Sequence, residues 1–289
     1  MLSIIIVNWN TRNLLDSCLE SIRRYTPTVP CEILVVDNSS SDGSAEMVKA
    51  KHANVILLEQ NANLGYARGN NLAFERAQGD FLLTLNPDTL LEDNSLQVAL
   101  DLLKKCKECG ALSVKFVGLD GETQASVRGF PSFLGLFGDY TGLGRIFPNT
   151  RLGSYRLRRF DYEKEQTAPQ PMGTFLLFRR EALESVGDAK HPFDENFPIY
   201  FNEVDLLYRM SKAGWKTLYT PAAHIRHVHG ASTRQRRKGM IWESHLSLLR
   251  YLRKHWSALQ CIFVLPGLAL LVCLSAFVRA RGFHAGFRS

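Results

Sequence analysis

Leu82-Leu-Thr-Leu-Asn86-Pro87-Asp88-Thr89 is the stretch of sequence that decides the fold. Its apolar first half predicts a short buried strand, and Asn86-Pro87 predicts a turn directly after it. Asp88 therefore follows the carboxyl end of a strand, which is where ligands bind in open α/β sheets. A carboxylate there can hold a divalent cation, and the cation can in turn hold a diphosphate.

On both sides of this stretch, short apolar runs alternate with longer segments of helical periodicity. We predict strands at 3–7, 32–36, 55–58, 81–85, 111–117, 173–178 and 216–219. We predict helices at 14–25, 44–51, 66–77, 95–107, 180–186, 203–213 and 241–255, with a polar, histidine-rich segment at 224–238. Strict alternation indicates an α/β fold in which helices cover both faces of a parallel sheet. Residues 118–170, rich in glycine, arginine and aromatic residues, break the alternation and are interpreted as a variable insertion on the acceptor side.

Polar clusters follow each of the first four strands. The clusters are Asn8-Trp-Asn10-Thr11, Asp37–Gly43, Asn61–Gly65 and Asn86-Pro-Asp88. One such cluster would be only a turn, but four on one rim of a parallel sheet predict a polar cleft. The chain lacks both G-x-G-x-x-G and the P-loop pattern. The acid and hydroxyls of the Asp37 cluster therefore suit a nucleobase and ribose better than a phosphate.

The phosphates need other partners. Either a cation at Asp88 or Arg68, together with the start of the helix at 66–77, could meet their charge. A surface arginine is the alternative for Arg68. Glu203 and Asp205 open a later helix beside several aromatic residues, where partial burial could tune a general base, although acids are also favoured there by the helix dipole. His224, His227 and His229 follow a strand, and at least one is expected to bind metal or diphosphate.

Charge is distributed unevenly in this chain of 289 residues, which has an apolar content of 45% and can form a sizeable core. Residues 224–289 contain eleven Lys and Arg residues and one acid, Glu243, whereas residues 1–223 contain 24 basic and 27 acidic residues. Such a tail fits either nucleic acid or an anionic membrane. Residues 258–278 favour the membrane and exclude nucleic acid as the expected partner, because they form an uncharged run of 21 residues. A spanning helix, a kinked or re-entrant segment, an interfacial helix and a buried core helix all remain alternatives for this run.

The cysteines suggest a reduced protein. Cys106 and Cys109 form a lone C-x-x-C without a second pair, so we interpret them as two incidental thiols rather than as a zinc site. The amino-terminal apolar run, residues 2–7, is too short for a signal peptide. These features predict a cytosolic protein held at a membrane by its carboxyl end.

Six motifs, taken together and in order, resemble those of family 2 glycosyltransferases, and in particular the rhamnosyltransferase-like branch. They are SIIIVNWN (3–10), VVDNSSSDGS (35–44), NANLGYARGNN (61–71), LLTLNPDT (82–89), FPIYFNEVDLLYR (197–209) and HVHGAST (227–233). The resemblance covers residues 2–255 and implies a GT-A fold, with a Rossmann-like, mixed and mostly parallel sheet flanked by helices. We therefore expect a catalytic domain at 1–240, followed at 241–289 by a basic helix and an apolar, membrane-associated helix.

The resemblance also implies an activity, the inverting transfer of a sugar from a nucleotide-diphospho-sugar. The implied donor-binding residues are Val7, Asn8, Asn10 and Asp37, to which the polar clusters add Asn63, Arg68 and Asn86. Asp88 and His227 are expected to hold magnesium or manganese, and Glu203 or Asp205 to act as the base. The acceptor is expected to be a lipid-linked or cell-envelope glycan, and the enzyme to lie at the cytoplasmic face of a bacterial inner membrane, as a peripheral or single-pass protein.

Two departures from the family pattern bear on this expectation. Asn86 replaces the first acid of the D-x-D metal motif, which predicts weak metal binding, and Asn202-Glu203-Val-Asp205 stands where Glu-Asp-x-Asp is usual. The pattern leaves open which of the two acids is the base. It also leaves open a binding protein with an inactive site. A sugar nucleotidyltransferase is disfavoured, because Asn8-Trp-Asn-Thr11 replaces the glycine-rich basic loop that such an enzyme needs after its first strand.

Overall fold

Four apolar runs in the first third of the chain form adjacent parallel strands. In the computed structural model, which describes residues 1–228 and 237–281, β1 (Leu2–Asn8) pairs with β2 (Cys31–Asp37) and β4 (Phe81–Leu85), and β2 pairs with β3 (Val55–Glu59). All seven residues of β1 are buried, because helices cover both faces of the sheet.

The second half of the sheet is mixed. Its strands are β5 (Thr89–Leu90), β6 (Cys109–Val117), β8 (Gln166–Thr167), β10 (Phe175–Arg179) and β11 (Lys216–His227). The order is β3-β2-β1-β4-β10-β6-β11-β5, with β8 pairing with β11. The all-parallel sheet predicted from the alternation is wrong, since β10 runs antiparallel to β4 and β6. The mixed, mostly parallel sheet that the resemblance implied is confirmed. β11 is parallel to β6, so its carboxyl end lies at the same edge as those of β1, β2 and β4.

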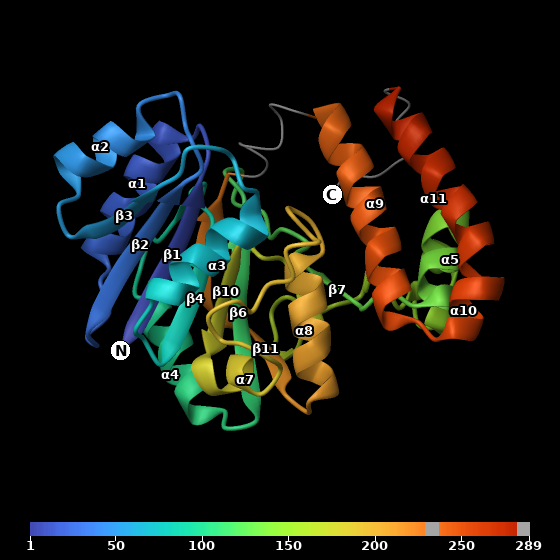
Figure 1. Ribbon diagram of the computed structural model, residues 1–289. Coiled ribbons are helices and arrows are strands. Elements are labelled where there is room, and N and C mark those ends of the chain that lie inside the picture. Colours follow the sequence, from blue (N-terminus) through green and yellow to red (C-terminus); the bar gives the residue numbers. More distant parts are fainter. Residues whose placement is uncertain (229–236, 282–289) are drawn as a thin grey trace.

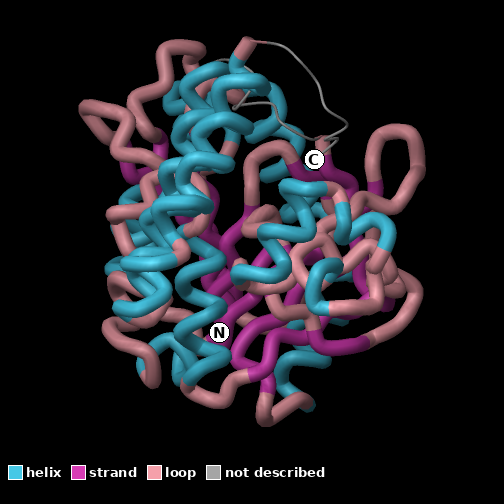
Figure 2. Tube along the Cα trace, turned by 90° about the vertical axis from the view of Figure 1, so that its right-hand side faces the viewer, coloured by secondary structure: helices cyan, strands magenta, loops and turns pink. Residues whose placement is uncertain are grey.

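Helices sandwich this sheet (Figure 1), and Figure 2 shows the strands inside the helical layers. One apolar core joins the sheet to α1 (Arg12–Arg24), α2 (Ser44–Lys51) and α4 (Ser95–Lys105). A second core, on the other face, joins it to α3 (Tyr66–Arg76), α7 (Arg180–Glu184) and α8 (Asn202–Lys212). Alternate residues of β1 serve the two cores: Ile4 and Ile6 the first, Ile5 and Val7 the second.

The predicted insertion and the carboxyl-terminal segment form a helical unit beside the sheet (Figure 1). The unit comprises α5 (Phe133–Thr141), α6 (Leu143–Ile146), η1 (Arg151–Gly153), α9 (Arg237–His255), α10 (Ala258–Phe263) and α11 (Leu265–Ala280). A third apolar cluster holds α5, α9 and α11 against α8. A two-stranded sheet of β7 (Val127–Arg128) and β9 (Gln170–Pro171) lies in the inserted region.

Three sequence-based predictions need correction. β11 continues through His224 to His227, so this part of the polar segment is strand, while His229 and residues 230–236 lie outside the described ranges. The apolar run 258–278 forms two helices, α10 and α11, since Pro266 fits the first turn of a new helix better than the interior of a continuous one. Within residues 1–228 and 237–281, no helix has both the length and the apolar composition needed to cross a membrane.

The third correction concerns the cysteines. Cys106 and Cys109 are joined by a disulfide bond, so the prediction of two incidental thiols is wrong. The turn between α4 and β6 places their Cα atoms 5.3 Å apart, within the range of roughly 4–7 Å that disulfide geometry requires.

Candidate active site

The ends of β1 and β2 form a rigid polar floor. Asn8 Nδ2 donates to Asp37 Oδ1 at 2.9 Å and to Ser40 Oγ at 3.1 Å, while Asn8 Oδ1 accepts from Thr11 Oγ1 at 2.6 Å. Ser40 N donates to Asp37 Oδ2 at 2.9 Å. Both oxygens of the buried Asp37 carboxylate therefore have donors, which fixes their direction in the cleft before any ligand binds.

Asn10 joins the two loops that follow these strands. Its N–H donates to Ser40 Oγ at 3.0 Å, and its Oδ1 accepts from Ser41 N at 2.8 Å. Its φ of 52° lies in the left-handed region, which asparagine tolerates better than most residues. Val7, buried one residue before Asn8, packs against α3 at Gly69, where a β-carbon would lie 2.9 Å from Val7 Cγ1.

The start of α3 is built differently from what the sequence suggested. Tyr66 N and Ala67 N both donate to the carbonyl of Pro198, at 2.6 and 3.1 Å. These two amides are thus unable to bind an anion, and that part of the phosphate hypothesis is wrong. Arg68 is exposed on the first turn of this helix.

Asn63 is also exposed, and its Oδ1 accepts from Gly65 N at 2.9 Å. It therefore shapes the turn that leads into α3.

Asp88 and His227 lie together at the carboxyl edge of the sheet, although 139 positions separate them. Nε2 of His227 is 3.6 Å from Oδ1 of Asp88, longer than an N–H···O hydrogen bond. That Oδ1 is buried and has no hydrogen-bond donor among the described residues. Backbone bonds fix the pair, since Val228 N donates to Asp88 O at 2.8 Å and His227 pairs with Thr89. An orphaned carboxylate oxygen facing an imidazole nitrogen fits a divalent cation.

Gln124, in the inserted region, orients His227. Its Nε2 donates to the backbone carbonyl of His227 at 3.1 Å, which turns its Oε1 toward His227 Nδ1, 2.8 Å away. Nδ1 must then carry the proton, and in the neutral ring the lone pair is on Nε2, the nitrogen that faces Asp88. Sequence reasoning missed Gln124, since nothing in one sequence links positions 103 residues apart.

The neighbouring turn residue Asn86 contributes through its backbone. Its N–H donates to Thr174 O at 3.0 Å, and its carbonyl accepts from Thr89 Oγ1 at 2.7 Å. Asn86 thus fixes the turn that presents Asp88.

Glu203 is half-buried at the start of α8, opposite Gly173. A β-carbon on Gly173 would lie 3.5 Å from Glu203 Cγ, in van der Waals contact with this side chain. Burial raises the pKa of Glu203 to about 7, against the opposing effects of backbone hydrogen bonds and the positive charge of Arg128. A carboxylate with a pKa near neutrality suits a general base.

Asp205 is in a different environment, although it lies only two residues away. It is fully buried, with Oδ2 2.9 Å from Arg209 Nε and Oδ1 2.7 Å from His255 Nε2 and 2.6 Å from Lys254 Nζ. Burial pushes its pKa upward, but hydrogen bonds from His255 and Lys254 and the charge of Arg209 outweigh burial and lower the pKa to about 2. Asp205 therefore ties α8 to α9.

Tyr66 connects the two halves of the site and was also missed from the sequence. Its hydroxyl donates to Gly173 O at 3.2 Å. Burial raises its pKa, and the negative charges of Glu203 and Asp88 raise it further, which places the phenol near both carboxylates.

Asn202, at the position where the family usually has an acid, is satisfied as an amide. Its Nδ2 donates to Ile199 O at 2.7 Å and to Phe197 O at 3.4 Å, and its Oδ1 accepts from Glu203 N at 2.7 Å. A carboxylate could not donate to the two carbonyls. The local backbone, in which Phe201 has a φ of 67°, therefore selects asparagine.

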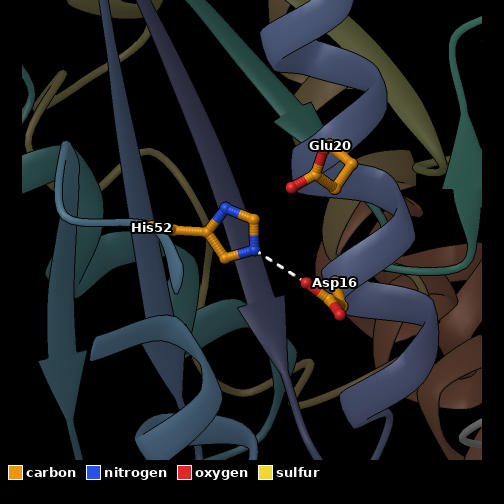
Figure 3. A group of neighbouring side chains, drawn as sticks. All are labelled: Asp16, Glu20 and His52. Atoms are coloured by element: carbon orange, nitrogen blue, oxygen red, sulfur yellow. Dashed lines mark hydrogen bonds and ion pairs between the residues drawn. The ribbon is translucent and has the colours of Figure 1, made fainter. Parts of the chain in front are cut away.

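Two further groups could in principle bind metal. His224 Nδ1 is 3.4 Å from Asp93 Oδ2, away from the Asp88 pair. Asp16, Glu20 and His52 offer ligand atoms within 4.8 Å of one another (Figure 3). Asp16 already bonds to His52 Nε2 at 2.9 Å and to Lys51 Nζ at 2.5 Å. The Lys51 ammonium group therefore already neutralises the carboxylate charge that would attract a metal ion.

The fold and this site define a class of protein. The mixed, mostly parallel sheet, with polar side chains at the carboxyl ends of β1, β2 and β4, is that of a nucleotide-sugar-dependent glycosyltransferase with a GT-A fold. The family model described as Glycosyl transferase family 2 matches residues 3–187, and the chain belongs to this family.

Known proteins agree with this assignment. The N-acetylglucosaminyl-diphospho-decaprenol L-rhamnosyltransferase of Mycobacterium tuberculosis is 31% identical over 245 residues, covering 81% of this chain and 78% of that protein. Among solved structures, a Pyrobaculum calidifontis mannosyltransferase in complex with GDP-Man and Mn²⁺ superposes with a TM-score of 0.59 at 17% identity, covering 99% of this chain and 76% of that one. Residues 1–349 of S. aureus TarS superpose with a TM-score of 0.56 at 15% identity, covering 99% of this chain and 75% of that one. These two likenesses show the fold.

Proposed function

We propose that this enzyme is an inverting glycosyltransferase that moves a deoxyhexose, with L-rhamnose the first candidate, from a nucleotide-diphospho-sugar to a hydroxyl of a lipid-linked envelope glycan. The observation that carries the proposal is the contrast between Glu203, whose pKa is raised to about 7, and Asp205, whose pKa is lowered to about 2. Only the first of these acids is poised to exchange a proton near neutral pH. The similarity to the mycobacterial rhamnosyltransferase supports the donor sugar and the lipid-linked acceptor.

In this proposal the nucleotide lies on the floor formed by Val7, Asn8, Asn10 and Asp37. The Asp37 carboxylate accepts hydrogen bonds from the base and ribose, and the asparagine amides both donate and accept them. Asn63, Arg68 and Asn86 border the diphosphate. Asp88 and His227 would hold a divalent cation, which when bound neutralises charge on the diphosphate leaving group.

Glu203 takes the proton from the acceptor hydroxyl as that oxygen attacks the anomeric carbon from the face opposite the nucleoside diphosphate. The bond between the anomeric carbon and the diphosphate oxygen breaks, the nucleoside diphosphate leaves, and the anomeric configuration inverts. The Tyr66 hydroxyl, which donates to Gly173 O, lies near enough to both Glu203 and Asp88 for their charges to raise its pKa.

We further propose that the enzyme works at the cytoplasmic face of a bacterial inner membrane, held there by α10 and α11. The basic carboxyl-terminal segment and the exposed side chains Leu259, Ile262 and Phe263 support this location. The acceptor would then be reached at the surface in which its lipid is embedded.

A thermal-shift screen of UDP-, GDP- and dTDP-sugars with manganese tests donor binding, because a ligand of the folded form raises the melting temperature. The stabilising donor is then incubated with a polyprenyl-diphospho-N-acetylglucosamine acceptor, and the product is analysed for its anomeric configuration. Retention of configuration would refute the proposed mechanism. Donor binding without either transfer or slow donor hydrolysis would favour the inactive binding protein instead.

A further inference from the structure

Helix α11 is apolar on both of its faces. Leu268, Val272 and Ala276 recur every four residues and are buried against the third apolar cluster. The opposite face carries large exposed side chains, which are Leu270, Leu271, Leu274, Phe277 and Val278. A helix that is apolar all round normally has a second apolar neighbour, either protein or lipid.

A second segment, distant in sequence, brings more exposed apolar side chains to the same helical unit. α5 packs on α11, with Leu136 in one buried cluster with Leu268 and Val272. Beyond that contact, the α5–α6 hairpin exposes Phe133, Leu134, Phe137, Ile146 and Phe147. Figure 1 shows α5 beside α11, well apart from the strands β1–β3.

We call the exposed apolar side chains of α5, α6, α10 and α11 the apolar surface. It comprises the exposed side chains already named on α11 and in the α5–α6 hairpin, together with Leu259, Ile262 and Phe263 of α10. So many exposed apolar side chains on helices that pack against one another indicate an interaction site.

Charge identifies the partner. Residues 133–159 and 237–281 contain twelve Lys and Arg residues and only two acids, Asp139 and Glu243. Both acids are paired within the unit, Asp139 with Arg156 and Glu243 with Arg250. The same segments expose Arg145, Arg151, Arg158, Arg159 and Arg253. Exposed apolar side chains in segments with an excess of positive charge match a bilayer with anionic headgroups.

We propose that the α5–α6 hairpin and the α10–α11 pair together form one interfacial surface that binds anionic membrane. The proposal deepens the proposed function, because it gives the inserted region a share in holding the enzyme at its acceptor. The surface lies on the bilayer and does not cross it. α11 has 16 residues, about 24 Å of helix against a hydrocarbon core of about 30 Å, and its inner face is occupied by protein.

Flotation with vesicles tests the surface in the full chain. Binding is expected to vesicles of equal parts phosphatidylcholine and phosphatidylglycerol, and to weaken both with phosphatidylcholine alone and at high salt. Phe147→Ser in the hairpin and Phe263→Ser in α10 should each weaken binding about tenfold, since each removes a large apolar side chain from the lipid.

Leu119→Ser is the control, since Leu119 is 67% exposed, between Phe147 at 49% and Phe263 at 77%, but follows β6 beside Asp120 and Glu122. It should leave binding unchanged. All three positions are exposed, so melting temperatures should stay within about a degree of the parent protein. If Phe147→Ser binds vesicles as well as the parent protein, or if only Phe263→Ser binds them more weakly, the hairpin has no part in membrane binding. The proposal of a shared surface would then be wrong, and α10 and α11 would bind the membrane without it. A dimer in solution that buries these residues and ignores vesicles would overturn it as well.

The outcome is separable from the proposed function. Donor binding, measured by thermal shift in detergent, should be the same for Phe147→Ser and the parent protein. If the parent protein binds anionic vesicles as expected but transfers no sugar, the membrane surface stands and the proposed activity fails.

Discussion

Gln124 holds His227 by both ends of its amide, with Nε2 donating to the backbone carbonyl at 3.1 Å and Oε1 lying 2.8 Å from Nδ1. The first bond fixes which end of the amide faces the ring, and the second then fixes the tautomer. His227 Nε2 is thereby directed at Asp88 Oδ1, 3.6 Å away. The inserted region, through Gln124, orients one side of the proposed metal site.

Gln124→Leu should therefore weaken manganese binding by about 10- to 100-fold, the usual effect of removing a residue that orients a metal-ligating histidine. Titration of free Mn²⁺ by electron paramagnetic resonance measures this without any turnover. Glu122→Gln, exposed in the same turn, is the control and should bind manganese normally. Equal affinities in the parent protein and Gln124→Leu would show that Gln124 has no part in metal binding.

Glu203→Gln should reduce turnover by about 10²- to 10⁴-fold, the range for loss of a general base, and leave nucleotide binding intact. In the parent enzyme, kcat/KM should rise with pH and level off above about pH 7, because the base acts as the carboxylate and its pKa is raised to about 7. The residual activity of the variant should lack this rise. A pH profile that is the same in both enzymes would remove Glu203 from the role of base.

The same carboxyl group predicts a pH-dependent stability difference. Its pKa rises from an ordinary value of 4.5 to about 7 on folding, so the folded state prefers the protonated form. Stability is therefore lost as pH increases from about 4.5 through 7. Glu203→Gln should be more stable than the parent protein at pH 8 by roughly 3 kcal/mol, and equal to it near pH 4. Urea unfolding of both proteins at the two pH values measures the difference in unfolding free energy. The same difference at pH 4 and pH 8 would contradict the prediction.

Asp205→Asn should unfold more easily by about 3–5 kcal/mol at pH 7, because it leaves Arg209, Lys254 and His255 without their buried counter-charge. The pKa of Asp205 is lowered from 3.8 to about 2, so its contribution is complete above about pH 4 and is lost as pH falls through 2. The gap between parent and variant should therefore narrow below pH 4. Asp194→Asn, which removes only the partly exposed bond to Lys254, should cost much less. Equal losses would show that Asp205 is no more important than its neighbour.

The sequence allowed most of the sheet to be predicted because each apolar run ends at residues that only a turn accommodates. β4 was predicted at Phe81–Leu85 and α2 at Ser44–Lys51, as observed. The polar, histidine-rich sequence after Tyr219 predicts a segment outside the sheet, but β11 continues through His224, Ile225 and Arg226. These residues pair with β6, Arg226 also pairs with Leu90 of β5, and the alternation leaves Ile225 buried between two polar side chains.

The site was less predictable, because its parts meet only in the folded chain. Asp37 and Asp88 were found since both follow strands. Gln124 and Tyr66 have no local pattern, and their roles come from partners 103 and 107 positions away. The sequence does not distinguish the surroundings of Glu203 and Asp205, since both open the same helix. Only in the folded chain does α9 bring Lys254 and His255 to Asp205.

Asn202→Asp would restore the acid that the family usually carries, yet it should harm this protein. The position is fully buried, and the amide donates to the carbonyls of Ile199 and Phe197. A carboxylate there would face two carbonyl oxygens without a donor of its own, at a cost of about 2–4 kcal/mol in unfolding free energy at pH 7. Asn149→Asp, at an exposed position, should change stability by less than about 0.5 kcal/mol. If Asn202→Asp were as stable as the parent protein and more active, Asn202 would indicate a site that has lost activity. If the variant is destabilised, the loop requires asparagine at this position, and Asn202 no longer supports the alternative of an inactive site.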